Sequence, residues 1–168
     1  MEESRIALGE IALEEGHPDE ALVAARAAAA APGIKTDSED SADANALAAR
    51  ALLAMGKGSE AAALLNTTLN LLPTIQNQPV RLKSEIAVAQ VEAVTDSAAA
   101  GRRLGIVVGR ANKAGLPGIE MEARLAEAEI MLQKGEQPQG LKAFAAIEKD
   151  AKAHSYMLIA RKASAHQR

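Results

Sequence analysis

Turn signals recur along this 168-residue chain at steps of about 40 residues. They are Gly16, Gly56, the corner Val94–Thr95–Asp96, and Gly135. Between them apolar residues recur at helical spacing, and Pro32–Gly33, Pro73 and Gly115 end the intervening segments. A period of this size is typical of a repeat architecture, in which neighbouring helical hairpins bury one another's apolar faces. The spacing therefore predicts four hairpins in series.

Composition favours helices throughout these segments. Roughly a quarter of the residues are alanine, the strongest helix former, and only 1% are aromatic. A core filled by alanine and aliphatic residues suits closely packed helices and argues against a β-sandwich. We predict one all-α domain over residues 1–168, with hairpins at approximately 3–33, 41–73, 79–115 and 117–153 and an end helix at 155–165. The polar stretch 35–43 is predicted to be a loop that caps the next helix.

Small residues recur after each turn, where two helices are expected to cross. They are Ala21, Ala61, Ala99 or Ala100, and Gly140. Three further glycines, at positions 101, 105 and 109, fall on one side of a predicted helix, where each costs about 1 kcal/mol of helix propensity relative to alanine. We expect them to allow close approach of a neighbouring helix; the alternative is a shallow docking groove for a partner helix.

The first two hairpins resemble the tetratricopeptide repeat. Leu8–Gly9, Gly16, Ala21 and Ala28 stand where that pattern has Leu-Gly, the turn glycine and two alanines, and the second hairpin repeats it with Gly56, Ala61 and Pro73. The period is longer than the usual 34 residues, and aliphatic residues or alanine replace all of the pattern's aromatic residues except Phe144. HEAT repeats have a suitable period, but their regular Pro, Asp and Arg recurrence is missing. The resemblance implies a right-handed α-solenoid.

The stretch 119–163 resembles the C-terminal repeat region of some bacterial serine/threonine protein kinases and related regulators. This resemblance implies that the chain is the C-terminal fragment of a larger protein. The sequence has none of the kinase's own motifs: it lacks a Gly-rich loop with a following lysine, His-Arg-Asp and Asp-Phe-Gly. Any kinase activity would therefore belong to another domain.

Several functional classes receive no support from the sequence. The net charge is −3 with scattered Lys and Arg, so no basic patch for nucleic acid is present. The chain has no cysteine, and His17, His154 and His166 lack metal-ligand spacing. No apolar run approaches the roughly 20 residues of a membrane-spanning helix. We expect a cytoplasmic protein with no membrane insertion, no catalytic residues, no metal site and no cofactor.

A binding surface is the remaining expectation. In solenoids like the tetratricopeptide repeat, the first helix of each hairpin lines the concave face, where peptides dock. That geometry points to a mixed and mostly acidic set of residues: Glu10, Leu13, Arg50, Leu53, Glu85, Glu92, Glu129 and Leu132. Such a face would suit a basic or amphipathic protein segment.

The leading prediction is thus a protein-interaction or scaffolding module with no chemistry of its own. The alternative is a regulatory or sensor domain at the C-terminal end of a bacterial serine/threonine protein kinase or transcriptional regulator. The N-terminal helix is also expected to allow self-association, because Ile6, Leu8 and Ile11 would be exposed on it.

Overall fold

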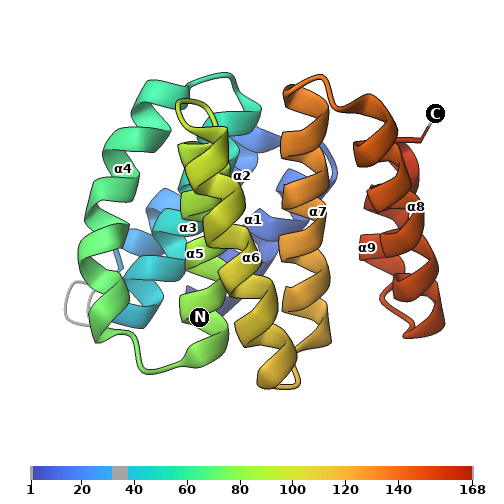
Figure 1. Ribbon diagram of the computed structural model, residues 1–168. Coiled ribbons are helices and arrows are strands. Elements are labelled where there is room, and N and C mark those ends of the chain that lie inside the picture. The colour runs from blue at the N-terminus through green and yellow to red at the C-terminus, as the bar shows by residue number, and fades with distance from the viewer. Residues whose placement is uncertain (1, 32–37, 168) are drawn as a thin grey trace. The chain divides into compact units, whose positions relative to one another are not determined.

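A computed structural model describes residues 2–31 and 38–167 and confirms the all-α prediction: each regular element in these ranges is a helix (Figure 1). The chain divides into two compact units, Met1–Thr95 and Asp96–Arg168. The boundary falls inside the third predicted hairpin, 79–115.

The first unit is a series of antiparallel helices with a short 3₁₀ turn. The helix α1 packs against α2 and α3 packs against α4, α2 and α4 also pack against the next odd-numbered helix, and α3 packs against both α1 and α5. This sequential packing is consistent with a tetratricopeptide-like solenoid. The elements are α1 (Glu2–Glu14), α2 (Pro18–Ala29), α3 (Ser38–Ala54), α4 (Gly58–Leu71), η2 (Leu72–Thr74) and α5 (Gln78–Glu92).

The second unit continues the same mode of packing with four helices. Each helix packs against the next, and α7 also contacts α9. Phe144, the one phenylalanine of the chain, is fully buried in the core of this unit together with Ile147. The elements are α6 (Ser97–Lys113), α7 (Pro117–Gln133), α8 (Gln137–Ala153) and α9 (Met157–Ala165).

The predicted turn glycines end their helices in a left-handed backbone conformation. At Gly16 the φ angle is +83°, the N–H of Gly16 donates to the carbonyl of Leu13, and the N–H of His17 donates to the carbonyl of Ala12. Glycine adopts this conformation without the steric penalty that a Cβ atom imposes. Gly56 and Gly135 end their helices in the same way. Because these glycines end helices through local backbone geometry, the sequence alone predicts where the helices end.

Small residues do lie at the helix crossings, as the sequence predicts. A Cβ atom built on Gly9 would lie 2.7 Å from Leu47 Cδ2 and 3.0 Å from Ala24 Cβ, so α1 approaches its neighbours very closely there. Gly140 is equally constrained by Leu132, whose Cδ2 would lie 2.6 Å from an added Cβ. Ala21 and Ala61 are fully buried.

Two local predictions are wrong. The helix α3 begins at Ser38, so residues 38–43 are helical; the rest of the predicted loop, 35–37, lies outside the described residues. Acidic residues in a first helical turn are stabilised by the helix dipole, and the carboxylate of Glu39 also accepts hydrogen bonds from the backbone of Gln76 and Asn77. The predicted close backbone approach at the α6 glycines is not observed: no other atom of the second unit lies within 4 Å of a Cβ built on Gly101 or Gly109, and a Cβ on Gly105 would meet only Glu127 Oε1, at an ordinary contact distance of 3.8 Å.

Candidate functional site

An ion-pair cluster joins α1 to α3 in the first unit. Arg50 lies with Nη1 4.0 Å from Glu10 Oε1 and Nη2 3.7 Å from Glu14 Oε1. The structure therefore brings the predicted site residues Glu10 and Arg50 together. Two other predicted residues, Leu13 and Leu53, are half-buried and pack against the hydrophobic core of this unit.

Asp43 on α3 extends this cluster, and the sequence analysis missed it. The pKa of its carboxyl group is raised to about 6, chiefly by burial; Lys83 on α5 lowers the pKa, and the neighbouring carboxylates Glu10, Asp40 and Glu39 raise it. A carboxyl group with so high a pKa is short of compensating positive charge. The helical spacing of Ala42, Ala46 and Ala49, which are buried, could have indicated that α3 begins within the acidic stretch.

The two predicted residues on α5 have different environments. Glu85 is buried, with 7% of its surface exposed, and its Oε1 lies 3.3 Å from Arg81 Nε. Glu92 is half-buried at the last position of α5. Glu85 therefore presents little of its carboxylate to a binding partner, whereas Glu10, with 43% of its side chain exposed, presents more.

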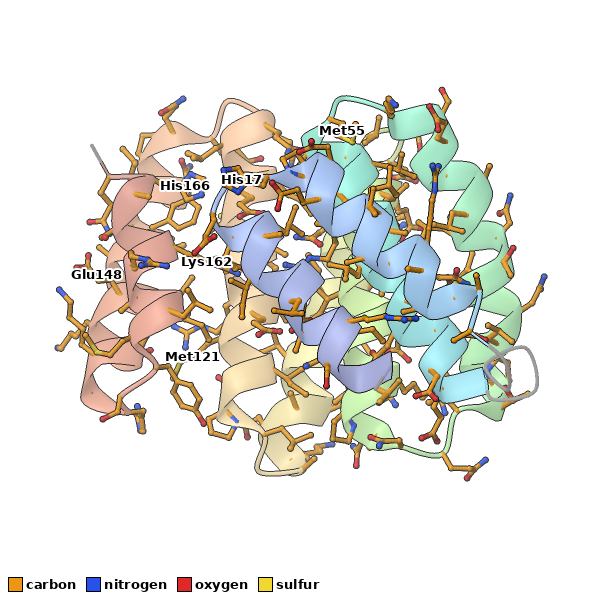
Figure 2. The ribbon with its side chains drawn as sticks, turned by 180° about the vertical axis from the view of Figure 1, so that it is seen from behind. His17, Met55, Met121, Glu148, Lys162 and His166 are labelled. Carbon is orange, nitrogen blue, oxygen red and sulfur yellow. The ribbon has the colours of Figure 1, made fainter. Side chains whose placement is uncertain are left out.

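In the second unit the predicted residues lie on α7. Glu129 Oε1 is 3.7 Å from Nε2 of His166, and hydrogen bonding to Glu129 raises the pKa of His166. The His166 ring stacks on Phe144 with ring centroids 4.3 Å apart, which holds the end of the described chain against this unit (Figure 2). Leu132 is half-buried against the core cluster that contains Phe144.

A second surface feature of the first unit is a groove of about 630 Å³ between α2, α3 and α4. Small alanine side chains on α2 and α3 leave most of the space, and Arg26, Glu60 and Thr67 supply polar groups at its walls. From the sequence, the alanine run predicts only helix and gives no sign of a groove. The remaining residues that line the groove are Leu22, Ala25, Ala29, Ala30, Ala44, Asn45, Ala48, Leu52, Ala63 and Leu64.

These features offer both charged and apolar surface on the first unit. Over residues 2–31 and 38–167, no cluster of three or more His, Asp and Glu could hold a metal ion. In the same part of the chain, no helix is both long and apolar enough to cross a membrane. The α1–α3 cluster offers carboxylates that can pair with cations, and the groove offers apolar surface.

Comparison with known proteins supports one part of the sequence interpretation. Residues 6–84, which run from α1 into α5, match the family described as the tetratricopeptide repeat. Repeats of this type in general form protein-interaction modules and are typically non-catalytic. The match shows no link to protein kinases. No curated protein and no solved structure matches the chain.

Proposed function

We propose that the chain binds a basic or amphipathic segment of another protein across α1, α3 and α5, and that it carries out no chemistry of its own. The match of residues 6–84 to the tetratricopeptide repeat is the observation that carries this proposal. Repeats that stack in this way expose an extended surface along their first helices, and that surface suits an elongated partner.

The charges on the first helices indicate the kind of partner that would bind. Glu10, Glu14 and Asp43 gather on the first helices, and Arg50 and Lys83 are the cations placed against them. A lysine or arginine side chain brought close to Asp43 would favour its ionised form and lower its pKa. Partner binding would then release a proton near pH 6, so affinity should weaken as the pH falls through that value.

The proposed surface includes every binding residue that was predicted on α1, α3 and α5, and Asp43 is added to them. Glu10 and Arg50 form an ion pair, Leu13 and Leu53 are half-buried against the core of the same unit, and Glu85 pairs with Arg81 on α5. Glu92 on α5 remains a proposed contact of this surface, and Glu129 and Leu132 on α7 remain proposed contacts of the second unit. A binding footprint mapped by amide NMR shifts would test each of them directly.

The test measures the binding of labelled peptides by fluorescence anisotropy. A basic amphipathic peptide and an acidic peptide of the same length would be compared, with the wild-type chain and with the double variant Glu10→Gln/Glu14→Gln. A matched control, Glu20→Gln/Glu60→Gln, removes two carboxylates from α2 and α4, whose side chains are 70% and 55% exposed. We expect only the basic peptide to bind and only the α1 variant to lose it.

Two outcomes would contradict the proposal. Equal binding of acidic and basic peptides would show that charge does not select the partner. Equal weakening by both double variants would show that only net charge matters and that α1 has no special part. Circular dichroism and thermal melting of each variant would establish that the fold is intact.

The finer alternative is that this module serves as the regulatory arm of a bacterial serine/threonine kinase or transcriptional regulator. Its support is the resemblance of residues 119–163 to the repeat regions of such proteins. The gene sequence distinguishes the regulatory arm from the interaction module. A reading frame that continues upstream into a Gly-rich loop and a His-Arg-Asp motif would favour the regulatory arm.

A further inference from the structure

Three large apolar side chains are exposed on the first hairpin. Leu8 and Ile11 on α1 are 64% and 53% exposed, and Val23 on α2 is 69% exposed. Ile6, which the sequence analysis placed with them, instead packs against the core. Because removal of apolar surface from water favours association, a partner surface that covers all three side chains would be stabilised by their burial.

Leu8 and Val23 lie on one side of the hairpin, and Ile11, three residues after Leu8, lies next to Leu8 on the outer flank of α1. Gly9 and Ala24 face each other across α1 and α2, because a Cβ on Gly9 would be 3.0 Å from Ala24 Cβ. Each helical residue turns about 100° from the one before it. Since the helices are antiparallel, Leu8 and Val23, each one residue before the facing pair, turn toward the same side. Figure 2 shows this hairpin, α1 beside α2, with the turn at His17 between them.

Along the hairpin, Val23 lies between Leu8 and Ile11, about half a residue from their midpoint. Because residue 9 lies opposite residue 24, Val23 is level with residue 10, between Leu8 and Ile11. A twofold axis through this level would place Val23 against Val23 of a second copy and Leu8 against Ile11 of that copy. Self-complementarity of this kind is what a twofold interface requires.

The charges at the two ends of α1 fit the same arrangement. Arg5 lies near its N-terminal end and Glu15 directly follows its C-terminal end, and both are exposed. Their midpoint, residue 10, is level with the same axis, so Arg5 of each copy would face Glu15 of the other. We propose that the face formed by Leu8, Ile11 and Val23 is the interface of a twofold homodimer of this chain, with α1 antiparallel to α1 of the second copy.

Sedimentation equilibrium of the full chain tests the interface. We expect a concentration-dependent dimer, loss of the dimer in Leu8→Glu, and an unchanged dimer in the control Ile106→Glu, which alters an apolar residue of α6 that is 60% exposed. Arg5→Glu or Glu15→Arg alone should weaken the dimer about tenfold, the effect of losing two surface ion pairs and adding repulsion. The combined charge swap should restore it. A monomeric wild type, or a Leu8→Glu variant that still dimerises, would overturn the proposal.

Disulfide formation tests where the proposed twofold axis passes. The sequence has no cysteine, so Val23→Cys introduces a single thiol that can pair only with the same residue of a second copy. Mild oxidation at a concentration where the dimer forms should give a covalent dimer rapidly, because the axis brings the two Cβ atoms close enough for a disulfide. Ile106→Cys is the matched control and should react only slowly. Equal rates for the two variants would rule out an axis at Val23.

This interface is separate from the proposed acidic surface. Neither Leu8 nor Val23 contributes to the carboxylate cluster of α1 and α3, so Leu8→Glu should leave binding of the basic peptide unchanged. Loss of dimerisation and loss of peptide binding are therefore distinguishable results.

Discussion

At the scale of single residues, Asp43 is unusual because it lowers the stability of the fold that contains it. Its carboxyl group has a higher pKa in the folded chain, about 6, than the usual value of 3.8. The unfolded chain therefore loses this proton first as the pH rises. The group contributes its full stability below about pH 4, and that contribution is lost progressively up to about pH 6. Residues that are costly in this way are often kept for binding.

The substitution Asp43→Asn should stabilise the protein at neutral pH. The shift of about 2 pKa units corresponds to at most about 3 kcal/mol, and partial exposure to solvent reduces the expected gain to about 1–2 kcal/mol. At pH 4 the gain should largely vanish, because the aspartate is then protonated in the folded state. Urea unfolding of both proteins at pH 4 and pH 7.5 measures the difference. A gain of equal size at both pH values would contradict the assigned role of burial.

Some of these residues could be predicted because the tetratricopeptide resemblance implies which helices lie side by side. It places Glu10 and Arg50 on the same face of successive first helices, and the two residues form an ion pair. Asp43 was missed because its neighbours Ser41, Asp40 and Ser38 are typical of loops and helix caps. The burial that raises the pKa of Asp43 depends on tertiary packing, which no local pattern contains.

At the scale of elements, the glycines of α6 differ from Gly140 in the space that surrounds them. A Cβ added at Gly101 or Gly109 meets no other atom of the second unit within 4 Å, whereas one added at Gly140 collides with Leu132. Composition alone could not separate these cases, because both are glycines within helical patterns. The distinction depends on which side of each helix faces its neighbour.

The double substitution Gly101→Ala/Gly109→Ala should therefore stabilise the second unit. Alanine is favoured over glycine inside a helix by about 1 kcal/mol per residue, so we expect a gain of about 2 kcal/mol. Gly140→Ala is the matched control: it should destabilise the unit, because Leu132 must move to make room. Thermal melting of the full chain compares them. A lower melting temperature for the double variant than for the wild type would contradict the open space assigned to Gly101 and Gly109.

At the scale of the whole molecule, the regular spacing of turns predicted the number and order of the helices. It did not predict the boundary between Thr95 and Asp96, which divides the chain into two compact units. At this place the repeat lacks its turn glycine, and Val94 and Thr95 stand there instead. Periodicity shows where hairpins occur, but the grouping of hairpins into cores depends on which side chains are buried together.

Each unit contains a buried cluster of its own, and this makes a prediction for stability. Leu47 is 2% exposed in the cluster of α1–α5, and Phe144 is fully buried in the cluster of α7–α9. Truncating either side chain to alanine should cost about 2–5 kcal/mol. Because the lost contacts are confined to one cluster, Leu47→Ala should accelerate amide hydrogen exchange mainly in residues 2–95, and Phe144→Ala mainly in residues 96–167. Hydrogen exchange followed by mass spectrometry resolves the two regions, and equal acceleration in both by either substitution would mean that the chain unfolds as a single cooperative body.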